Sequence, residues 1–85
     1  MVEFNINFNY DAADHMAVVL KSVTADRTDY IVRPVDPELV LRFGKQVIIF
    51  KEHDNYNCGS HVDETFMDFV DALANAIRRQ DRYEA

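Results

Sequence analysis

The first residues of the chain alternate between apolar and polar side chains without a break. The apolar members are Val2, Phe4, Ile6, Phe8 and Tyr10, and the polar members between them are Glu3, Asn5, Asn7 and Asn9. Successive side chains of a strand point to opposite faces, so this pattern predicts a strand with one buried face and one wet face. A chain that begins in this way has to supply a second layer that covers the apolar side of a sheet.

Further strands are predicted in the middle of the chain. Residues 46–51 hold four consecutive apolar residues between polar ends, a run too short for a lone helix and rich in β-branched side chains. Residues 30–33 form a second short run that ends at Pro34. Proline fixes its own φ angle and biases the preceding residue towards extended geometry, so we expect a turn there.

Two segments have the spacing of amphipathic helices. In residues 12–23, Ala13, Met16 and Val23 recur at helical spacing after Asp11, which is a suitable N-cap. In residues 61–80 an apolar stripe recurs every three or four residues, acids gather early and bases gather late, as the helix dipole favours. Both segments are therefore predicted to be helical.

Residues 37–43 allow two interpretations. Asp36 followed by Pro37, with Gly44 after the segment, is a good set of signals for a short helix. Alternatively, the segment is a strand that pairs with residues 46–51 through a tight turn at Gly44 and Lys45. The strand register places apolar residues opposite apolar residues and Glu38 opposite a lysine, so we favour the hairpin.

Together these elements predict one α+β domain over residues 1–85, in the order βαβββα. We expect a single, mostly antiparallel four-stranded sheet with two helices packed on one face. The other face then has no cover, and an apolar patch with a polar rim often marks an association site. The predicted interface residues are Val40, Arg42, Val47, Ile49, Asn5 and Asn7.

Charge and cysteine content narrow the range of functions. The chain has 15 acidic and nine basic residues, a net charge of −6, which argues against direct binding to nucleic acids or anionic membranes. One cysteine excludes an internal disulfide, and the start of the chain has neither a basic region nor an apolar core of a signal peptide. We expect a cytoplasmic protein without a cofactor.

The polar segment between residues 52 and 61 contains the residues best suited to chemistry. His53, Cys58 and His61 carry imidazole and thiolate groups, which bind zinc and also act as base and nucleophile in catalysis. Their spacing matches no known structural zinc motif. The segment could equally be a polar loop that contains these residues without forming a site. A small dimeric enzyme or a metal-binding protein that uses this loop is an alternative function.

The second helix carries an acidic stripe made of Glu64, Asp68 and Asp71. Positions i, i+4 and i+7 lie on one helical face, where they satisfy the helix dipole or bind a basic partner. An acidic mimic that inhibits a DNA- or RNA-binding protein is therefore a further alternative. Our leading hypothesis is a non-catalytic protein-interaction or regulatory module that binds a protein partner, or itself as a homodimer, through the open sheet face or the acidic helix.

Overall fold

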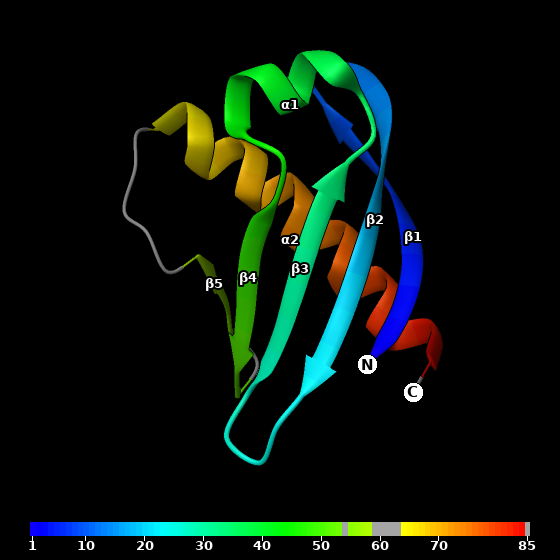
Figure 1. Cartoon of the computed structure of the whole chain (residues 1–85), viewed down its shortest axis with the longest axis vertical. Helices are drawn as coiled ribbons and strands as arrows, with labels where there is room; N and C mark the ends of the chain where they lie inside the picture. Colours follow the sequence, from blue (N-terminus) through cyan, green and yellow to red (C-terminus); the bar gives the residue numbers. More distant parts are fainter. Residues whose placement is uncertain (54, 59–63, 85) are drawn as a thin grey trace.

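The five strands form one antiparallel sheet in which strands adjacent in sequence are also adjacent in space (Figure 1). The computed structural model describes residues 1–53, 55–58 and 64–84. The elements are β1 (Val2–Tyr10), β2 (Ala13–Val23), β3 (Thr28–Pro34), α1 (Pro37–Phe43), β4 (Val47–Glu52), β5 (Asn55–Cys58) and α2 (Glu64–Glu84). The predicted α+β class is confirmed, but the sheet has five strands and the order is βββαββα.

The predicted helix over residues 12–23 is wrong, because this segment is the strand β2. Asp11 and Ala12 form a two-residue turn with φ angles of 55° and 59°, which lets β2 fold back on β1. The two strands pair from Val2↔Lys21 to Tyr10↔Ala13. Helical spacing and strand alternation coexist in this segment, and the complementary surface of β1 decides in favour of the strand.

The predicted strand over residues 37–43 is also wrong, and the alternative helix is what forms. The Asp36 carboxylate accepts a hydrogen bond from the Glu38 backbone N–H at 3.0 Å, and Pro37 occupies the first turn. At the other end, the Gly44 N–H donates to the Val40 carbonyl at 2.9 Å, with Gly44 at a φ angle of 100°. Local capping therefore determines the structure of this segment.

With residues 37–43 in α1, the partner of β4 is β3. Tyr30 lies opposite Ile49, and Val32 lies opposite Val47. Because Tyr30 and Val32 are fully buried, Val47 and Ile49 face the core, and Ile48 has the opposite orientation. The predicted faces of this strand are therefore inverted.

The core lies between the sheet and α2, which crosses one face of the sheet behind the strands in Figure 1. We call this covered side the inner face and the other side the open face. Phe69 of α2 is fully buried and stacks on Phe43 of α1, with ring centroids 4.1 Å apart, so α1 closes one end of the same core. Two aromatic rings of β1, those of Phe8 and Tyr10, contact the Phe69 ring edge-on.

Candidate functional site

The open face carries a continuous row of apolar side chains. The central members follow from the register, in which Leu20 lies opposite Ile31 and Ile31 opposite Ile48. Met16 and Ile48 are the most exposed, at 46% and 47% of their surface. We define the open-face patch by its members Met16, Val18, Leu20, Ile31, Ile48 and Phe50. An apolar surface of this kind is a candidate for protein association.

Charged residues flank the open-face patch on two sides. Glu3 lies opposite Leu20 on the β1 side, and the exposed Arg33 lies opposite Val18 on the β3 side. At the lower end of the patch, Arg27 pairs with Asp29 at 3.0 Å, and its guanidinium lies 4.9 Å from the centroid of the Phe50 ring. The immediate surroundings of the patch thus contain both signs of charge.

The structure divides the predicted interface residues into three groups. Val47 and Ile49 are 4% and 0% exposed and belong to the core, so they form no part of a surface. Val40 and Arg42 lie on α1, where Arg42 pairs with Asp11 at 3.1 Å. The two asparagines of the prediction, at positions 5 and 7, do lie on the open face, beside the open-face patch.

A second candidate is a polar cluster beneath the sheet, which the sequence reasoning missed. The Asp81 carboxylate of α2 accepts hydrogen bonds from the hydroxyls of Tyr30 at 2.7 Å and Tyr56 at 2.6 Å. The Lys21 ammonium donates to the same carboxylate at 3.2 Å, and that of Lys51 lies 3.9 Å away. We call these five residues the Asp81 cluster; they join α2 to strands β2, β3, β4 and β5.

The Asp81 cluster shifts the pKa values of its members. Burial raises the pKa of Asp81, but hydrogen bonds from Tyr56, Tyr30 and Lys21 outweigh burial and bring the pKa below its ordinary value of 3.8. Burial and then the bond to the Asp81 carboxylate raise the pKa of Tyr56 to about 12. The same causes raise the pKa of Tyr30. The cluster thus contains a carboxylate and two neutral phenols at neutral pH.

This arrangement favours an anchor for α2 over a catalytic centre. A base or nucleophile has to reach a substrate, whereas the Asp81 oxygens are already bonded to two hydroxyls and an ammonium group. The sequence does hold one signal for the cluster. An acid in the last turns of a helix opposes the helix dipole, and Asp81 stands there among arginines.

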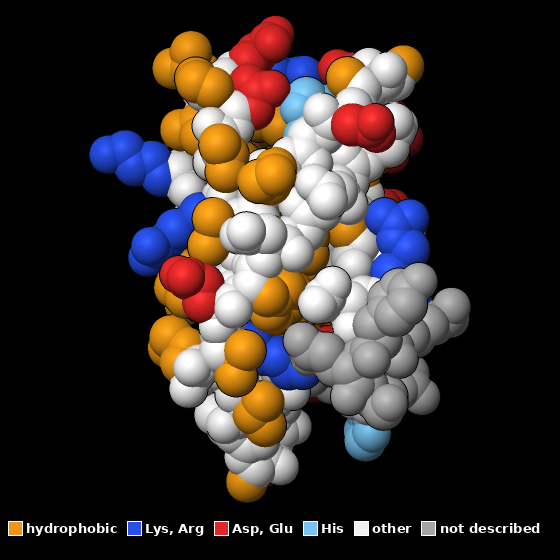
Figure 2. Space-filling model, turned by 90° about the vertical axis from the view of Figure 1, so that its right-hand side faces the viewer, with side chains coloured by type: hydrophobic (Ala, Val, Ile, Leu, Met, Phe, Trp, Pro, Cys, Tyr) orange, Lys and Arg blue, Asp and Glu red, His pale blue; other side chains and the backbone are white. Residues whose placement is uncertain are grey.

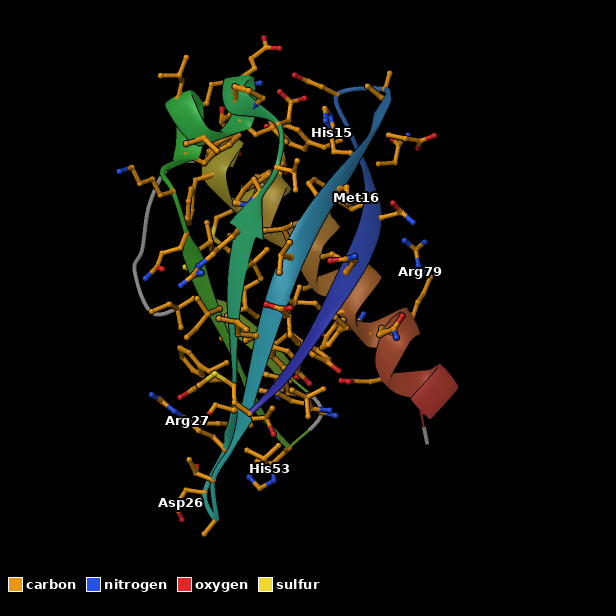
Figure 3. All side chains as sticks on the ribbon, turned by 45° about the vertical axis from the view of Figure 1, so that its right-hand side comes forward. His15, Met16, Asp26, Arg27, His53 and Arg79 are labelled. Atoms are coloured by element: carbon orange, nitrogen blue, oxygen red, sulfur yellow. The ribbon has the colours of Figure 1, made fainter. Side chains whose placement is uncertain are left out.

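The predicted reactive loop contains a strand in the structure. Cys58 ends β5, paired with Ile49, whereas His53 lies in the turn beyond the Glu52↔Asn55 pair. Asn55 and Cys58 are three steps apart along an extended strand, a distance of about 10 Å, so His53 and Cys58 do not converge. Figure 3 shows His53 at the end of the sheet that also carries Asp26.

His61 lies outside the described residues, and within the described ranges no group of three histidine, cysteine, aspartate or glutamate side chains is placed to hold a metal ion. A hollow of about 510 Å³ lies beside Cys58 and is lined by both faces of β4, with Arg27 and Phe66 at its sides. Among the lining residues that the structure describes, Cys58 is the one nucleophile and no base accompanies it. Metal binding or catalysis by residues 53–61 stays a prediction.

The residues of the predicted acidic stripe lie on α2. Glu64, Asp68 and Asp71 are all exposed on α2, on the side of the molecule away from the open face. Their role in binding a basic partner or in mimicking a nucleic acid stays a prediction, because a solvated helix face has the same appearance.

Comparisons with known proteins give no further guidance. No protein-family model matches the chain, and neither a curated protein nor a solved structure is significantly similar to it. No helix in the described part of the chain is long and apolar enough to cross a membrane. The function has to be inferred from the surface of the molecule itself.

Proposed function

We propose that this protein is a non-catalytic interaction module that associates with a second copy of itself through the open-face patch. The observation that supports the proposal is a sheet face that no described helix covers, with six apolar residues on three adjacent strands. In an antiparallel sheet one face is commonly solvated and polar, and an apolar one gains free energy when it is covered.

The distribution of charge favours a second copy as the partner. The chain has a net charge of −6, but the acidic stripe lies on α2, so two copies that meet at their open faces keep these carboxylates apart. Glu3 and Arg33 lie on opposite sides of β2, beside Leu20 and Val18 of the patch. A two-fold axis that lies in the interface, between these two residues, brings Glu3 of each copy over Arg33 of the other.

The size of the face is sufficient for a dimer. The molecule measures 34 × 26 × 19 Å, and the sheet occupies the broad side in Figure 1. A stable complex buries about 800 Å² on each partner, which requires most of this side. Since the open-face patch covers only its centre, we expect a dissociation constant in the micromolar range, about 1–100 µM.

The test compares two substitutions that each place a carboxylate on an exposed aliphatic side chain. Ile48 lies in the patch and is 47% exposed, whereas Leu41 lies on α1 and is 87% exposed. In sedimentation equilibrium, Ile48→Asp is expected to weaken the dimer at least about tenfold, and Leu41→Asp to leave it unchanged. Ile49→Asp is unsuitable, because Ile49 is fully buried and the variant is expected to unfold.

A charge exchange tests the two-fold arrangement. Glu3→Arg and Arg33→Glu are each expected to weaken the dimer, because each places like charges opposite one another. The double variant is expected to restore the wild-type dissociation constant. A wild type that sediments as a monomer at millimolar concentration contradicts the proposal, as does equal weakening by Ile48→Asp and Leu41→Asp.

A further inference from the structure

The strand β1 forms one edge of the sheet, and none of the other described strands pairs with its outer backbone groups. The Asn7 carbonyl accepts a hydrogen bond from the Arg79 guanidinium of α2 at 3.4 Å, so it points away from β2. Met16, the β2 residue opposite Asn7, uses its carbonyl to accept from the Val35 N–H on the far side of β2. The odd-numbered residues of β1 therefore point their N–H and C=O groups outward.

A groove runs along this edge between β1 and α2. It has a volume of about 300 Å³, and we call it the β1–α2 groove; its lining consists of Asn5, Ile6, Asn7, Ala76, Arg79 and Gln80. Figure 2 looks onto this side of the molecule and shows a mostly white band of backbone and uncharged polar side chains down its middle. In Figure 3, Arg79 reaches from α2 along β1.

We propose that the β1 edge binds an extended segment of a partner protein as a sixth strand of the sheet. The outward N–H and C=O groups of Glu3, Asn5, Asn7 and Asn9 supply the main-chain hydrogen bonds of such a pairing. Alternate side chains of the segment then point into the β1–α2 groove, over the small side chain of Ala76. The partner segment that we propose is a strand whose apolar residues, at alternate positions, meet Ile6 and Ala76, the two apolar residues of an otherwise polar lining.

Arg79 protects this edge in the free protein. Natural sheets guard exposed edges with charged side chains, and the one charged residue of β1 is Glu3, near its start. The bond of Arg79 to the Asn7 carbonyl is long, at 3.4 Å, and Arg79 lies on an exposed part of the helix. An incoming strand has to replace this one bond, so removal of the Arg79 side chain should favour binding.

A second copy of β1 within a folded molecule does not suit this edge. Figure 1 shows the C-terminal end of α2 passing beneath β1 and beyond it. Because α2 extends past this edge, we expect it to hinder full-length pairing of two β1 strands from two folded molecules. A single extended segment brings no helix, and the overhanging end of α2 then forms a floor beneath it.

The probe is a synthetic peptide of residues 2–10, which is known to form a strand in this fold and carries no helix. One version is N-methylated at residues 4, 6 and 8, so that its odd-numbered N–H groups stay free and its other edge is blocked against fibril formation. The matched control is N-methylated at residues 3, 5 and 7. We expect the first to bind at least about tenfold more tightly, the factor of roughly one hydrogen bond.

The site of binding is read from amide chemical shifts of the labelled protein. The proposal predicts changes in residues 2–10 and 76–80. Changes centred on Leu20, Ile31 and Ile48 place the peptide on the open face and overturn the proposal. Absence of binding at a peptide concentration of about 1 mM, the weak limit of useful affinity, also overturns it.

Three protein variants complete the test. Asn7→Pro removes an outward N–H without loss of a bond to β2, so it should weaken binding about tenfold while the amide spectrum of the rest of the sheet is kept. Arg79→Ala should strengthen binding. Arg78→Ala makes the same change of charge one residue away and should have no effect; equal effects of the two arginine variants, or undiminished binding by Asn7→Pro, contradict the proposal.

Discussion

At the scale of single residues, the turn at Asp11 and Ala12 decides the topology. Both residues have positive φ angles, a conformation that asparagine and glycine adopt more easily than aspartate and alanine. The sequence at this pair therefore predicts a helix cap, although the two residues form a hairpin turn. The strain of Ala12 remains in the folded protein, because the long β1–β2 pairing outweighs it.

Ala12→Gly is expected to stabilise the protein by about 0.5–1 kcal/mol, because glycine tolerates the φ angle of 59°. The matched control is Gly44→Ala, which places a Cβ on a residue at a φ angle of 100° and should destabilise by about 1–2 kcal/mol. Urea unfolding of both variants measures the two signs. A destabilising Ala12→Gly would show that the turn does not have this conformation.

Asp81 is the residue whose charge matters most for the inner face. Asp81→Asn should lower the free energy of unfolding by about 2–4 kcal/mol at neutral pH, because the tyrosine and lysine groups lose a charged acceptor. A carboxylate with a lowered pKa in the folded state contributes stability above its unfolded pKa, and this contribution is lost as the pH falls through the folded value.

The difference between wild type and Asp81→Asn should therefore be constant near neutrality and shrink once the pH falls below about 4, the ordinary carboxyl range. Urea unfolding between neutral and strongly acidic pH measures this difference. A gap that stays constant down to the lowest pH would show that the Asp81 charge does not carry the effect.

At the scale of elements, the aromatic contacts of Phe69 join α1, β1 and α2. Phe69→Ala should cost about 3–5 kcal/mol, since the ring is fully buried and stacks on Phe43. Phe50→Ala is the comparison, because Phe50 lies on the open face, half-buried under Arg27, and should cost about 1–2 kcal/mol. Thermal unfolding separates these two outcomes; equal losses would contradict the assignment of faces.

The helices and strands also show which sequence patterns predict secondary structure correctly. The alternation in residues 2–10 and the stripe in α2 survive intact, because each has one periodicity and one buried side. The segment of β2 fits both periods, and only its pairing with β1 distinguishes them. For α1 the capping residues Asp36 and Gly44 were better guides than cross-strand pairing, since capping needs no distant partner.

The candidate sites, too, could be predicted only where they did not depend on distant partners. The predicted pairing of β4 with residues 37–43 assigned the two faces of β4 the wrong way round, so the predicted patch contained Val47 and Ile49 where the surface has Ile48 and Phe50. The prediction that one face of the sheet lacks a helix did not depend on this register. The Asp81 cluster draws on four strands and a helix, and no local pattern in the sequence brings them together.

At the scale of the whole molecule, the protein has a closed side and an open side. The aromatic core and the Asp81 cluster fix α2 to the inner face, while the open-face patch and the β1 edge face outward. The acidic stripe lies on α2, whereas both signs of charge surround the open-face patch. Contact between two open faces therefore keeps the acidic stripes of the two copies apart.

The central claim is that a second copy covers the open-face patch. The most direct measurement is the relaxation of side-chain methyl groups by a dissolved paramagnetic probe, at protein concentrations below and above the dissociation constant. We expect the methyl groups of Leu20, Ile31 and Ile48 to lose contact with the probe as the concentration rises, while those of Leu41 stay exposed. Methyl groups of the patch that remain equally accessible at all concentrations would contradict it.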